Sequence, residues 1–407
     1  MTAPAHLFVP APTHRTGYPS SWRDLPAHQQ PDWHSHPFLT GVRTVLGDAA
    51  PVTSAHDTSR LAEALQSVAE GEGRVLHVGD CAESFFECGP AEVARKLEVL
   101  DDLAAAAPGT EPVVQLGRLG GQFAKPRSAA TEEIHGRTMP VFRGHMVNGE
   151  TATPAARRAD PRRMLWAYEA SRRVTRQVDE QRARHGAGRG GPWTSHEALV
   201  LDYESCLIRR DRHGPRLAST HLPWIGERTR QLGHAHVELM AEISNPVGCK
   251  LGPDADPDSV VALCDRLDPR RRPGHLVLIP RMGAGRVSDT LPALVRAIRR
   301  GGHRPVWLSD PMHGNTVRTP HGTKTRYLDQ MVSEIDDFRG VLADEGVRPG
   351  GLHLEVAADE VTECVSPEVS ERDLPRRNST LCDPRLNPSQ AAAVVRAGLT
   401  DAPGARR

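Results

Sequence analysis

The sequence predicts an α/β protein built on a (β/α)8 barrel, a TIM barrel, with an N-terminal extension. From residue 55 onward, short apolar runs alternate with amphipathic segments, which is typical of βαβ units and a parallel sheet. Eight such runs favour a closed barrel over an open sheet. The chain has 407 residues, and α/β barrels commonly occupy about 250 residues or more as one unit. We therefore expect an extension over 1–54, a barrel over 55–398 and a tail over 399–407.

The spacing of apolar residues predicts each element of the barrel. The predicted strands are 74–78, 112–116, 218–224, 247–251, 275–279, 305–308, 351–354 and 379–381. Apolar residues recur every three or four positions in the predicted helices, which are 90–106, 161–181, 233–243, 258–267, 291–299, 324–343 and 389–397. Residues 184–191 are rich in Gly and Arg, and we interpret them as a flexible link within the second crossover.

The N-terminal extension shows little periodicity. Trp22, Trp33 and Phe38 lie within it, and large aromatic side chains are costly to leave in water. We therefore expect these three side chains to pack against the barrel or against a partner subunit.

The composition excludes several classes of function. Lys plus Arg and Asp plus Glu both total 51, so the formal net charge of zero attracts neither nucleic acid nor an acidic membrane. No apolar run approaches the ~20 residues of a membrane span, and the first residues do not have the pattern of a signal peptide. Seven cysteines without regular spacing favour a reducing cytoplasm over a disulfide framework.

Clusters of Gly, Pro and charged residues follow nearly every predicted strand. In a barrel, the loops after the strands converge on the C-terminal face, where active sites form. One subset of these residues offers a thiol, an imidazole and two carboxylates: Cys81, His313, Glu355 and Asp383. Their spacing alone equally fits a buried thiol, a loop histidine and surface carboxylates. Their shared position predicts a metal site, and the mixed donors favour manganese, cobalt, iron or zinc over calcium or magnesium.

A second subset of the strand-end residues is cationic. Its members are Arg118, Lys125, Arg127, Arg228, Lys250 and Arg281. Scattered Lys and Arg usually form a solvated surface, but cations that converge on a barrel mouth indicate a ligand with several phosphates or carboxylates. The sequence contains neither a phosphate-binding Gly-x-x-x-x-Gly-Lys loop nor a Gly-x-Gly-x-x-Gly fingerprint, so a nucleotide is not favoured.

Several of these strand-end stretches are recognisable as family motifs. They are 79–83 (GDCAE), 121–128 (GQFAKPRS), 224–231 (WIGERTRQ), 281–284 (RMGA), 310–316 (DPMHGNT), 361–364 (VTEC) and 382–387 (CDPRLN). Together they resemble the class II 3-deoxy-D-arabino-heptulosonate 7-phosphate (DAHP) synthases over about residues 74 to 398. Long motifs in the family's order make chance a poor alternative.

The resemblance implies a metal-dependent transferase of the shikimate pathway. It would join phosphoenolpyruvate, erythrose 4-phosphate and water to give DAHP and phosphate. Cys81, His313, Glu355 and Asp383 would hold manganese or cobalt, with zinc or iron as alternatives. Phosphoenolpyruvate would be held by Arg118, Glu227, Arg228, Lys250 and Arg281, of which Lys250, Glu227 and Arg118 would be catalytic. The loop residues Lys125, Arg127 and Ser128 would bind the aldose phosphate. The family also implies a homo-oligomer, a dimer or larger.

The sequence departs from the family pattern at four places. Ser366-Pro367 stands where Gly-Gly is usual, His145 where Asp is more frequent, Ser288 where Arg is common and His77 where Gln is more usual. None is a proposed ligand, but they leave open an alternative acceptor, an amino-substituted erythrose 4-phosphate. A second alternative is an inactive barrel that acts as a binding partner. It is disfavoured because every expected metal ligand and cation is present.

The second crossover looks too short for the additional helical pair of larger relatives, which is associated with feedback by aromatic amino acids. We therefore expect an enzyme that Phe, Tyr and Trp do not inhibit, as in relatives that serve secondary metabolism.

Overall fold

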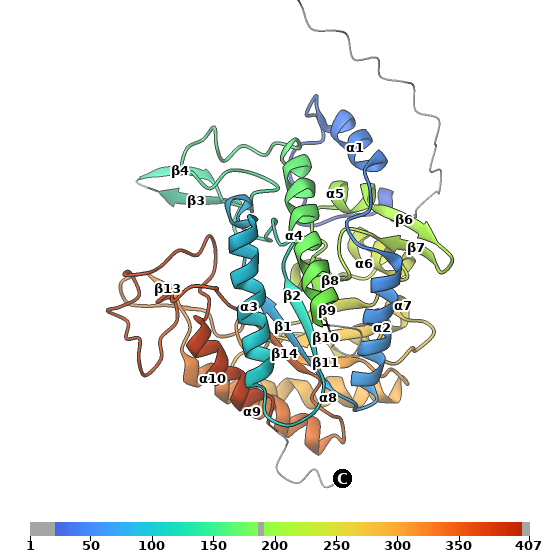
Figure 1. Cartoon of the computed structure of the whole chain (residues 1–407), viewed down its shortest axis with the longest axis vertical. Coiled ribbons are helices and arrows are strands. Elements are labelled where there is room, and N and C mark those ends of the chain that lie inside the picture. The colour runs from blue at the N-terminus through green and yellow to red at the C-terminus, as the bar shows by residue number, and fades with distance from the viewer. Residues whose placement is uncertain (1–20, 135, 186–190, 401–407) are drawn as a thin grey trace, which may run out of the picture.

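The computed structural model describes residues 21–134, 136–185 and 191–400, and it contains the predicted closed parallel barrel (Figure 1). Neighbouring strands follow one another along the chain, and the last strand closes on the first. In chain order they are β1 (Arg74–Gly79), β2 (Val113–Arg118), β5 (Trp193–Glu197), β8 (Leu222–Ile225), β9 (Val247–Leu251), β10 (Leu276–Pro280), β11 (Val306–Ser309) and β14 (Gly351–Glu355).

Seven of the eight predicted strands are confirmed, and the eighth is wrong. Residues 379–381 are not a strand, because they lie in the long connection between β14 and the last helix. The missing strand is β5, in the region that we interpreted as the end of a crossover. Its sequence, Trp-Thr-Ser-His-Glu, contains a single apolar residue, yet all five positions are buried. Hydrogen bonds satisfy two of its polar side chains: Thr194 bonds to His221, and His196 bonds to Glu204. A search for apolar runs therefore misses this strand.

The predicted helices are present, with ends that differ from the prediction by a few residues. They are α3 (Pro90–Ala106), α4 (Arg163–His185), α6 (Ala235–Glu242), α7 (Pro257–Leu267), α8 (Val287–Arg300), α9 (Leu328–Asp344) and α10 (Pro388–Gly398). Helix α9 begins later than predicted because Lys324–Thr325 forms strand β13, which pairs with β12 (Val317–Arg318). The predicted flexible link at 184–191 lies mostly outside the described residues.

Three helices were not predicted: α1 (Leu39–Asp48), α2 (Ala55–Ala69) and α5 (Leu201–Cys206). Leu61, Leu65 and Val68 of α2 form one buried cluster with Val75 and Val306, close to the starts of β1 and β11. Helix α2 therefore packs across the N-terminal end of the barrel, opposite the loops that carry the predicted site. Within the described residues, no helix is both long and apolar enough to cross a membrane.

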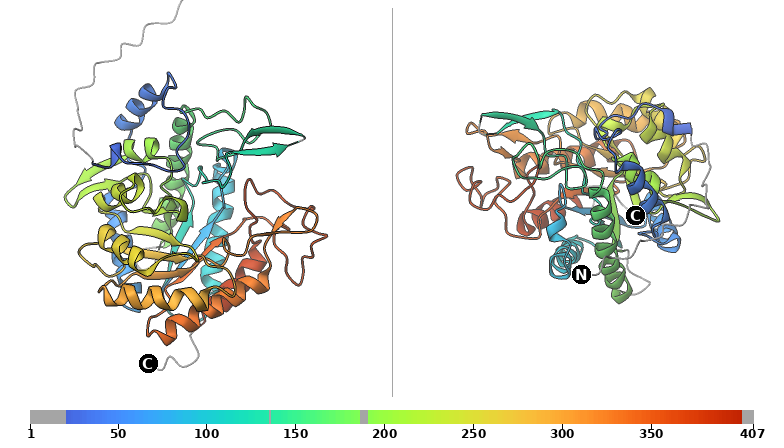
Figure 2. Two further views of the ribbon diagram at one scale, coloured as in Figure 1. Left: turned by 180° about the vertical axis from the view of Figure 1, so that it is seen from behind. Right: turned by 90° about the horizontal axis from the view of Figure 1, so that it is seen from above.

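Irregular connections enlarge the other end of the barrel. The hairpin of β3 (Thr131–Ile134) and β4 (Arg137–Pro140) and the hairpin of β12 and β13 extend from the same side of the barrel (Figures 1 and 2). A third hairpin, β6 (Ile208–Asp211) with β7 (Gly214–Leu217), lies on the opposite side. These hairpins follow β2, β11 and β5 in the chain, so they extend loops of the C-terminal face.

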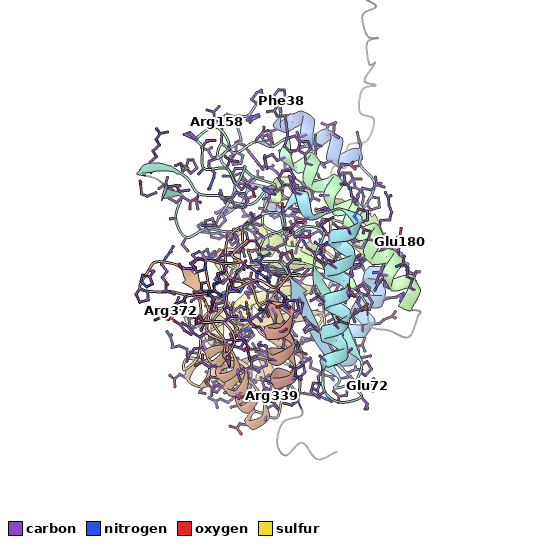
Figure 3. The ribbon with its side chains drawn as sticks, turned by 60° about the vertical axis from the view of Figure 1, so that its left-hand side comes forward. Phe38, Glu72, Arg158, Glu180, Arg339 and Arg372 are labelled. Carbon is purple, nitrogen blue, oxygen red and sulfur yellow. The ribbon has the colours of Figure 1, made fainter. Side chains whose placement is uncertain are left out.

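The N-terminal extension is packed on the barrel through Trp22 and Trp33, two of the three aromatic side chains expected to be covered. Trp22 is 3% exposed and Trp33 is 2% exposed, and the Trp33 indole N–H donates a 2.8 Å hydrogen bond to Asp202. Phe38 does not pack on the barrel: it is 50% exposed and lies at the outer end of the molecule (Figure 3), so packing against a partner subunit stays a prediction for this residue. The guanidinium of Arg162 covers one face of the Phe38 ring. The Phe38 ring is therefore half exposed to solvent and in contact with the Arg162 guanidinium.

We expect Trp33→Ala to lower the free energy of unfolding by about 3–5 kcal/mol, because it removes a buried indole and its hydrogen bond. Phe38→Ala is the matched control, and it should change the free energy of unfolding by less than about 1 kcal/mol. Urea denaturation of both variants measures the difference. Equal destabilisation by the two substitutions would contradict the packing of the extension on the barrel.

Candidate active site

The register of three strands sets the predicted site residues at one level of the barrel. Gly79 at the end of β1 pairs with Arg118 at the end of β2 and with Glu355 at the end of β14. Cys81 follows β1 by two residues, and Lys250 lies next to the end of β9. The carboxyl ends of parallel strands meet on one face, so residues far apart in the sequence converge there.

The imidazole of His313 and the carboxylates of Glu355 and Asp383 form a possible metal-binding group. Their ligand atoms lie within 4.8 Å of one another, and His313 Nε2 is 3.2 Å from Glu355 Oε1. Cys81 borders this group, since its Sγ accepts a hydrogen bond from the backbone N–H of Asp383 at 3.4 Å. A donor set of one sulfur, one nitrogen and carboxylate oxygens fits a divalent transition ion. The structure thus brings three of the four predicted ligands into one group, and Cys81 lies at its border.

Asp383 reaches the site by a route that the sequence analysis did not predict. It was expected to follow a strand of its own. It lies instead in the connection between β14 and α10, and Glu355 is the last residue of β14, the strand before that connection. Two of the four candidate ligands therefore come from one strand and the loop that follows it. Lys324 contacts the Asp383 carboxylate at 3.1 Å and Lys125 contacts it at 3.7 Å.

The thiol of Cys81 is unusually acidic for a buried cysteine. A hydrogen bond from Cys382 lowers the pKa of Cys81 to about 7, although burial acts in the opposite direction. Lys125 also favours the thiolate. Because the thiolate is the form that binds metals, this environment suits a metal ligand.

Asp310 orients His313. The Asp310 carboxylate contacts His313 Nδ1 at 2.8 Å, which leaves Nε2 directed at Glu355. Burial disfavours its charge, but His313 and Lys250 hold the pKa of Asp310 well below its usual value. Hydrogen bonding of the distal nitrogen by a carboxylate is common for histidines that bind metals. Asp310 was part of a recognised motif, three residues before His313, but the sequence analysis gave it no role.

Glu355 is fully buried and is held by three cationic side chains in addition to His313. Its carboxylate contacts Arg118 at 3.0 Å, Lys125 at 3.3 Å and Arg326 at 2.9 Å. Although burial opposes ionisation, His313, Lys125 and Arg326 hold the pKa of Glu355 well below its usual value. Arg326 was missed because it lies in a stretch predicted as helix, where a strand-end pattern could not point to it.

A second buried carboxyl, Glu197, was missed with its strand. Glu197 is the last residue of β5, so it shares the C-terminal end of the barrel with the predicted site. Burial raises the pKa of Glu197, while the charges of Lys125, Lys250 and Arg118 oppose this rise. The carboxyl therefore lies within the field of the site's cations.

Two buried cations and an indole form the floor of the predicted phosphoenolpyruvate site. The Arg118 guanidinium lies 5.4 Å from the centroid of the Trp224 ring, and the Lys250 ammonium lies 4.8 Å from it. Lys250 also contacts Asp310 at 2.9 Å. Burial lowers the pKa of Lys250 to about 8, although Asp310 acts to raise it. A lysine with this pKa exchanges a proton more readily near neutral pH than an exposed lysine.

The other predicted phosphoenolpyruvate residues are placed less uniformly. Arg281 donates a 2.6 Å hydrogen bond to the backbone oxygen of His313, which places it beside the candidate metal ligands. Glu227 is instead engaged by the Arg230 guanidinium at 2.7 Å and 2.9 Å and by the backbone N–H of Gly252 at 2.6 Å. In this structure Glu227 therefore connects Arg230 with the backbone of the loop that follows β9.

The predicted aldose-phosphate residues divide between the centre and the rim. Lys125 is buried and contacts Glu355 and Asp383, as described above. Arg127 lies beside Cys382, with 3.3 Å between a guanidinium nitrogen and the sulfur. Ser128 accepts a 2.6 Å hydrogen bond from Arg228. That bond connects the loop predicted for one substrate with a residue predicted for the other.

The departures from the family pattern lie in different surroundings. His145 is buried among Phe85, Phe86 and Phe142, and its Nδ1 accepts a hydrogen bond from the backbone N–H of Phe85. Ser366 donates a hydrogen bond to Glu368. Ser288 lies in the first turn of α8. His77 lies inside the barrel below Arg118, with His353 between them.

The described residues contain a second group of possible ligands: Asp57, Asp179 and His221. The Arg182 guanidinium is paired with both of its carboxylates, at 3.0 Å in the case of Asp57. One cation of the chain thus pairs with both carboxylates of this group. The group formed by His313, Glu355 and Asp383 is the stronger metal candidate, because the thiol of Cys81 borders it and Asp310 orients its histidine.

Comparison with known proteins identifies the family of the chain. The model of the class-II DAHP synthetase family matches residues 17–186 and 175–396, which is most of the chain. The chain belongs to the class-II DAHP synthetase family. A probable phospho-2-dehydro-3-deoxyheptonate aldolase of Pseudomonas fluorescens is 46% identical over 376 residues, which cover 91% of this chain and 94% of that protein. A phospho-2-dehydro-3-deoxyheptonate aldolase of Streptomyces coelicolor is 38% identical, with the same coverage of both chains.

A solved structure supports the fold independently of close sequence similarity. The phospho-2-dehydro-3-deoxyheptonate aldolase of Francisella tularensis shares only 11% identity, but it superposes with a TM-score of 0.52 over 88% of this chain and 96% of that one. Together, family membership and the closed barrel confirm the two main predictions from the sequence, a DAHP synthase-type transferase and a TIM barrel.

We expect Asp310→Asn to weaken Mn²⁺ binding by about 10- to 100-fold, because the carboxylate that orients His313 is lost. Calorimetric titration of the purified metal-free protein with Mn²⁺ measures the affinity directly, without an activity assay. Asp254→Asn is the matched control, since the Asp254 side chain is 91% exposed. An unchanged affinity in folded Asp310→Asn protein would exclude an orienting role for this carboxylate.

Proposed function

We propose that the protein condenses phosphoenolpyruvate with erythrose 4-phosphate and water to form DAHP and phosphate, as the first step of the shikimate pathway. One observation carries the proposal: a thiol, an imidazole and two carboxylates converge with several cations at the C-terminal end of a barrel. This arrangement suits two phosphorylated substrates and a divalent metal. The names of the two similar curated proteins support the same reaction.

The metal would be held by Cys81, His313, Glu355 and Asp383, with manganese or cobalt as the proposed ion. When bound, such an ion supplies Lewis-acid chemistry, which polarises an aldehyde oxygen and stabilises the charge that develops on it. The fit rests on the donor set, on the acidity of Cys81 and on the orientation of His313 by Asp310.

The chain's own residues would bind the two anionic substrates side by side and align their reacting carbons. We assign phosphoenolpyruvate to Arg118, Arg228, Lys250 and Arg281 with Glu227, and the aldose phosphate to Lys125, Arg127 and Ser128. Arg118 and Lys250 are buried, so their charges act in a low-dielectric setting, where they offset phosphate and carboxylate charge more strongly than in water. Fixed positions also lower the entropic cost of aligning the two reacting carbons.

Proton transfer is assigned to Lys250. The nucleophilic terminal carbon of phosphoenolpyruvate attacks the aldehyde, water adds to the neighbouring enol-ether carbon, and phosphate leaves. The Lys250 ammonium, whose pKa is about 8, lies within reach of both Asp310 and His313, so it has neighbours with which to exchange a proton.

We further propose that the protein works in the cytoplasm as a homo-oligomer, a dimer or larger. All seven cysteines are unpaired in the structure, which agrees with a reducing compartment. The family resemblance supports the oligomer.

Cys81→Ala and His313→Ala should each abolish metal-supported phosphate release from phosphoenolpyruvate and erythrose 4-phosphate, while circular dichroism shows an intact fold. The assay compares reactions with and without the aldose phosphate and with Mn²⁺ or Co²⁺. Cys206→Ala and His213→Ala are matched controls outside the site. Wild-type turnover by either site variant, after chelation and return of the metal, would refute the ligand assignment.

The same assay identifies the acceptor. Erythrose 4-phosphate should support faster phosphate release than its amino-substituted analogue. The opposite preference would assign the chain to the amino-substituted reaction. If the metal-loaded protein releases no phosphate with either aldehyde, the inactive-barrel alternative is favoured.

Phe, Tyr and Trp should not inhibit the enzyme. Helix α4 ends at His185 and β5 begins at Trp193, so only residues 186–192 separate them and no helical pair fits there. Initial rates with each amino acid at up to about millimolar concentration, alone and in pairs, test this expectation. Inhibition at low concentrations of Trp or Phe would contradict it.

A further inference from the structure

Two histidines lie in the barrel interior directly beneath the proposed substrate site. His353 is on β14 and His77 faces it from the paired position on β1. The imidazole Nε2 of His353 is 2.7 Å from the Arg118 guanidinium, and its Nδ1 is 2.8 Å from Nδ1 of His77. Both histidines are fully buried. A continuous line of hydrogen bonds therefore runs from His77 through His353 to Arg118.

The hydrogen bonds fix which ring nitrogens carry protons. A guanidinium can only donate, so His353 must accept at Nε2 and carry its proton on Nδ1. That N–H then donates to Nδ1 of His77, which must be an acceptor. Both rings are consequently neutral, and burial together with Arg118 and Lys250 holds the pKa of His77 well below its usual value.

Arg118 is held on several sides by acceptors. Its Nε–H donates to the backbone oxygen of Asp80 at 3.1 Å, and its second terminal nitrogen donates to the backbone oxygen of Cys81 at 3.4 Å and to Glu355 at 3.0 Å. The nitrogen that contacts His353 carries one more hydrogen, for which the described residues provide no partner. The His353 contact therefore determines where this remaining N–H points.

We propose that His77 is a positioning residue for the phosphoenolpyruvate site. By accepting the Nδ1–H of His353, it keeps Nε2 of His353 as the acceptor for Arg118, and this contact aims the Arg118 guanidinium at the substrate. The inference rests on the proposed function, because it takes phosphoenolpyruvate to be the ligand of Arg118. His77 needs only to accept one hydrogen bond from His353. Among the described residues, the structure records no contact between His77 and the proposed metal ligands.

This requirement distinguishes two substitutions of similar size. In His77→Asn, the amide oxygen takes the place of Nδ1 and can accept the His353 N–H, so the alignment of Arg118 is retained. In His77→Leu, the acceptor is lost and a buried N–H of His353 remains unsatisfied, which favours a shift of the ring or a change of tautomer. The Nε2–H tautomer of His353 would place a donor against the Arg118 guanidinium.

The test measures phosphoenolpyruvate binding and turnover by the metal-loaded enzyme. We expect His77→Leu to raise both the Kd from calorimetry and the KM for phosphoenolpyruvate roughly tenfold, the effect of losing one well-placed hydrogen bond. The KM for the aldose phosphate should change by less than about twofold. His77→Asn should keep phosphoenolpyruvate affinity within about twofold of the wild type, because its amide oxygen takes the place of Nδ1. If His77→Leu fails to fold, His77→Phe takes its place, because its ring has the shape of the imidazole but no acceptor.

A control separates positioning from general destabilisation. His221 is another fully buried histidine; it is bonded to Thr194 near the start of β5, and no contact between it and Arg118 is recorded among the described residues. His221→Leu should lower the thermal midpoint without changing the KM for phosphoenolpyruvate. Unchanged phosphoenolpyruvate affinity in His77→Leu, or equal loss in His77→Asn, would overturn the inference. If the wild type itself neither binds nor consumes phosphoenolpyruvate, the proposed function fails instead.

Discussion

Glu355 is a fully buried carboxylate held by Arg118, Lys125, Arg326 and His313, and the surrounding site depends on these contacts. An ionised carboxylate in the interior is tolerated only where charges and hydrogen bonds compensate for its lost hydration. Removal of one partner from a buried ion pair typically costs about 3–5 kcal/mol. These contacts require four segments to meet at Glu355: the ends of β2 and β14 and the loops after β2 and β11. Their meeting fixes the positions of the other candidate metal ligands.

The same arrangement gives the site its chemical character. Cations at the mouth outnumber what Glu355 and Asp383 can neutralise, so the surplus favours anionic substrates. Asp310 restrains both His313 and Lys250, and it thereby connects the metal candidates with the cationic floor. Groups fixed in this way need little rearrangement when charge develops during a reaction, which is the usual basis of electrostatic catalysis.

The barrel interior beneath the site is polar as well as apolar. His77 and His353 form one hydrogen-bonded line, and the polar strand β5 satisfies Thr194 and His196 through partners outside the strand. Because the interior is polar, His353 and His77 beneath the site can orient the Arg118 guanidinium through hydrogen bonds. A polar interior also weakens the apolar signal by which strands are usually found, because a buried polar residue looks like a surface residue in sequence.

The sequence by itself determined the barrel, seven of its eight strands and the motifs that carry the ligand types, because strand-end position and residue chemistry are local properties. It also determined the family. Tertiary structure alone decided that β5 is a strand, that Asp383 comes from the loop after β14, and that Arg326 and Asp310 complete the site. These features depend on partners far apart in the chain. A buried Thr or Glu is stable only when such a partner is present, and no local pattern records that partner.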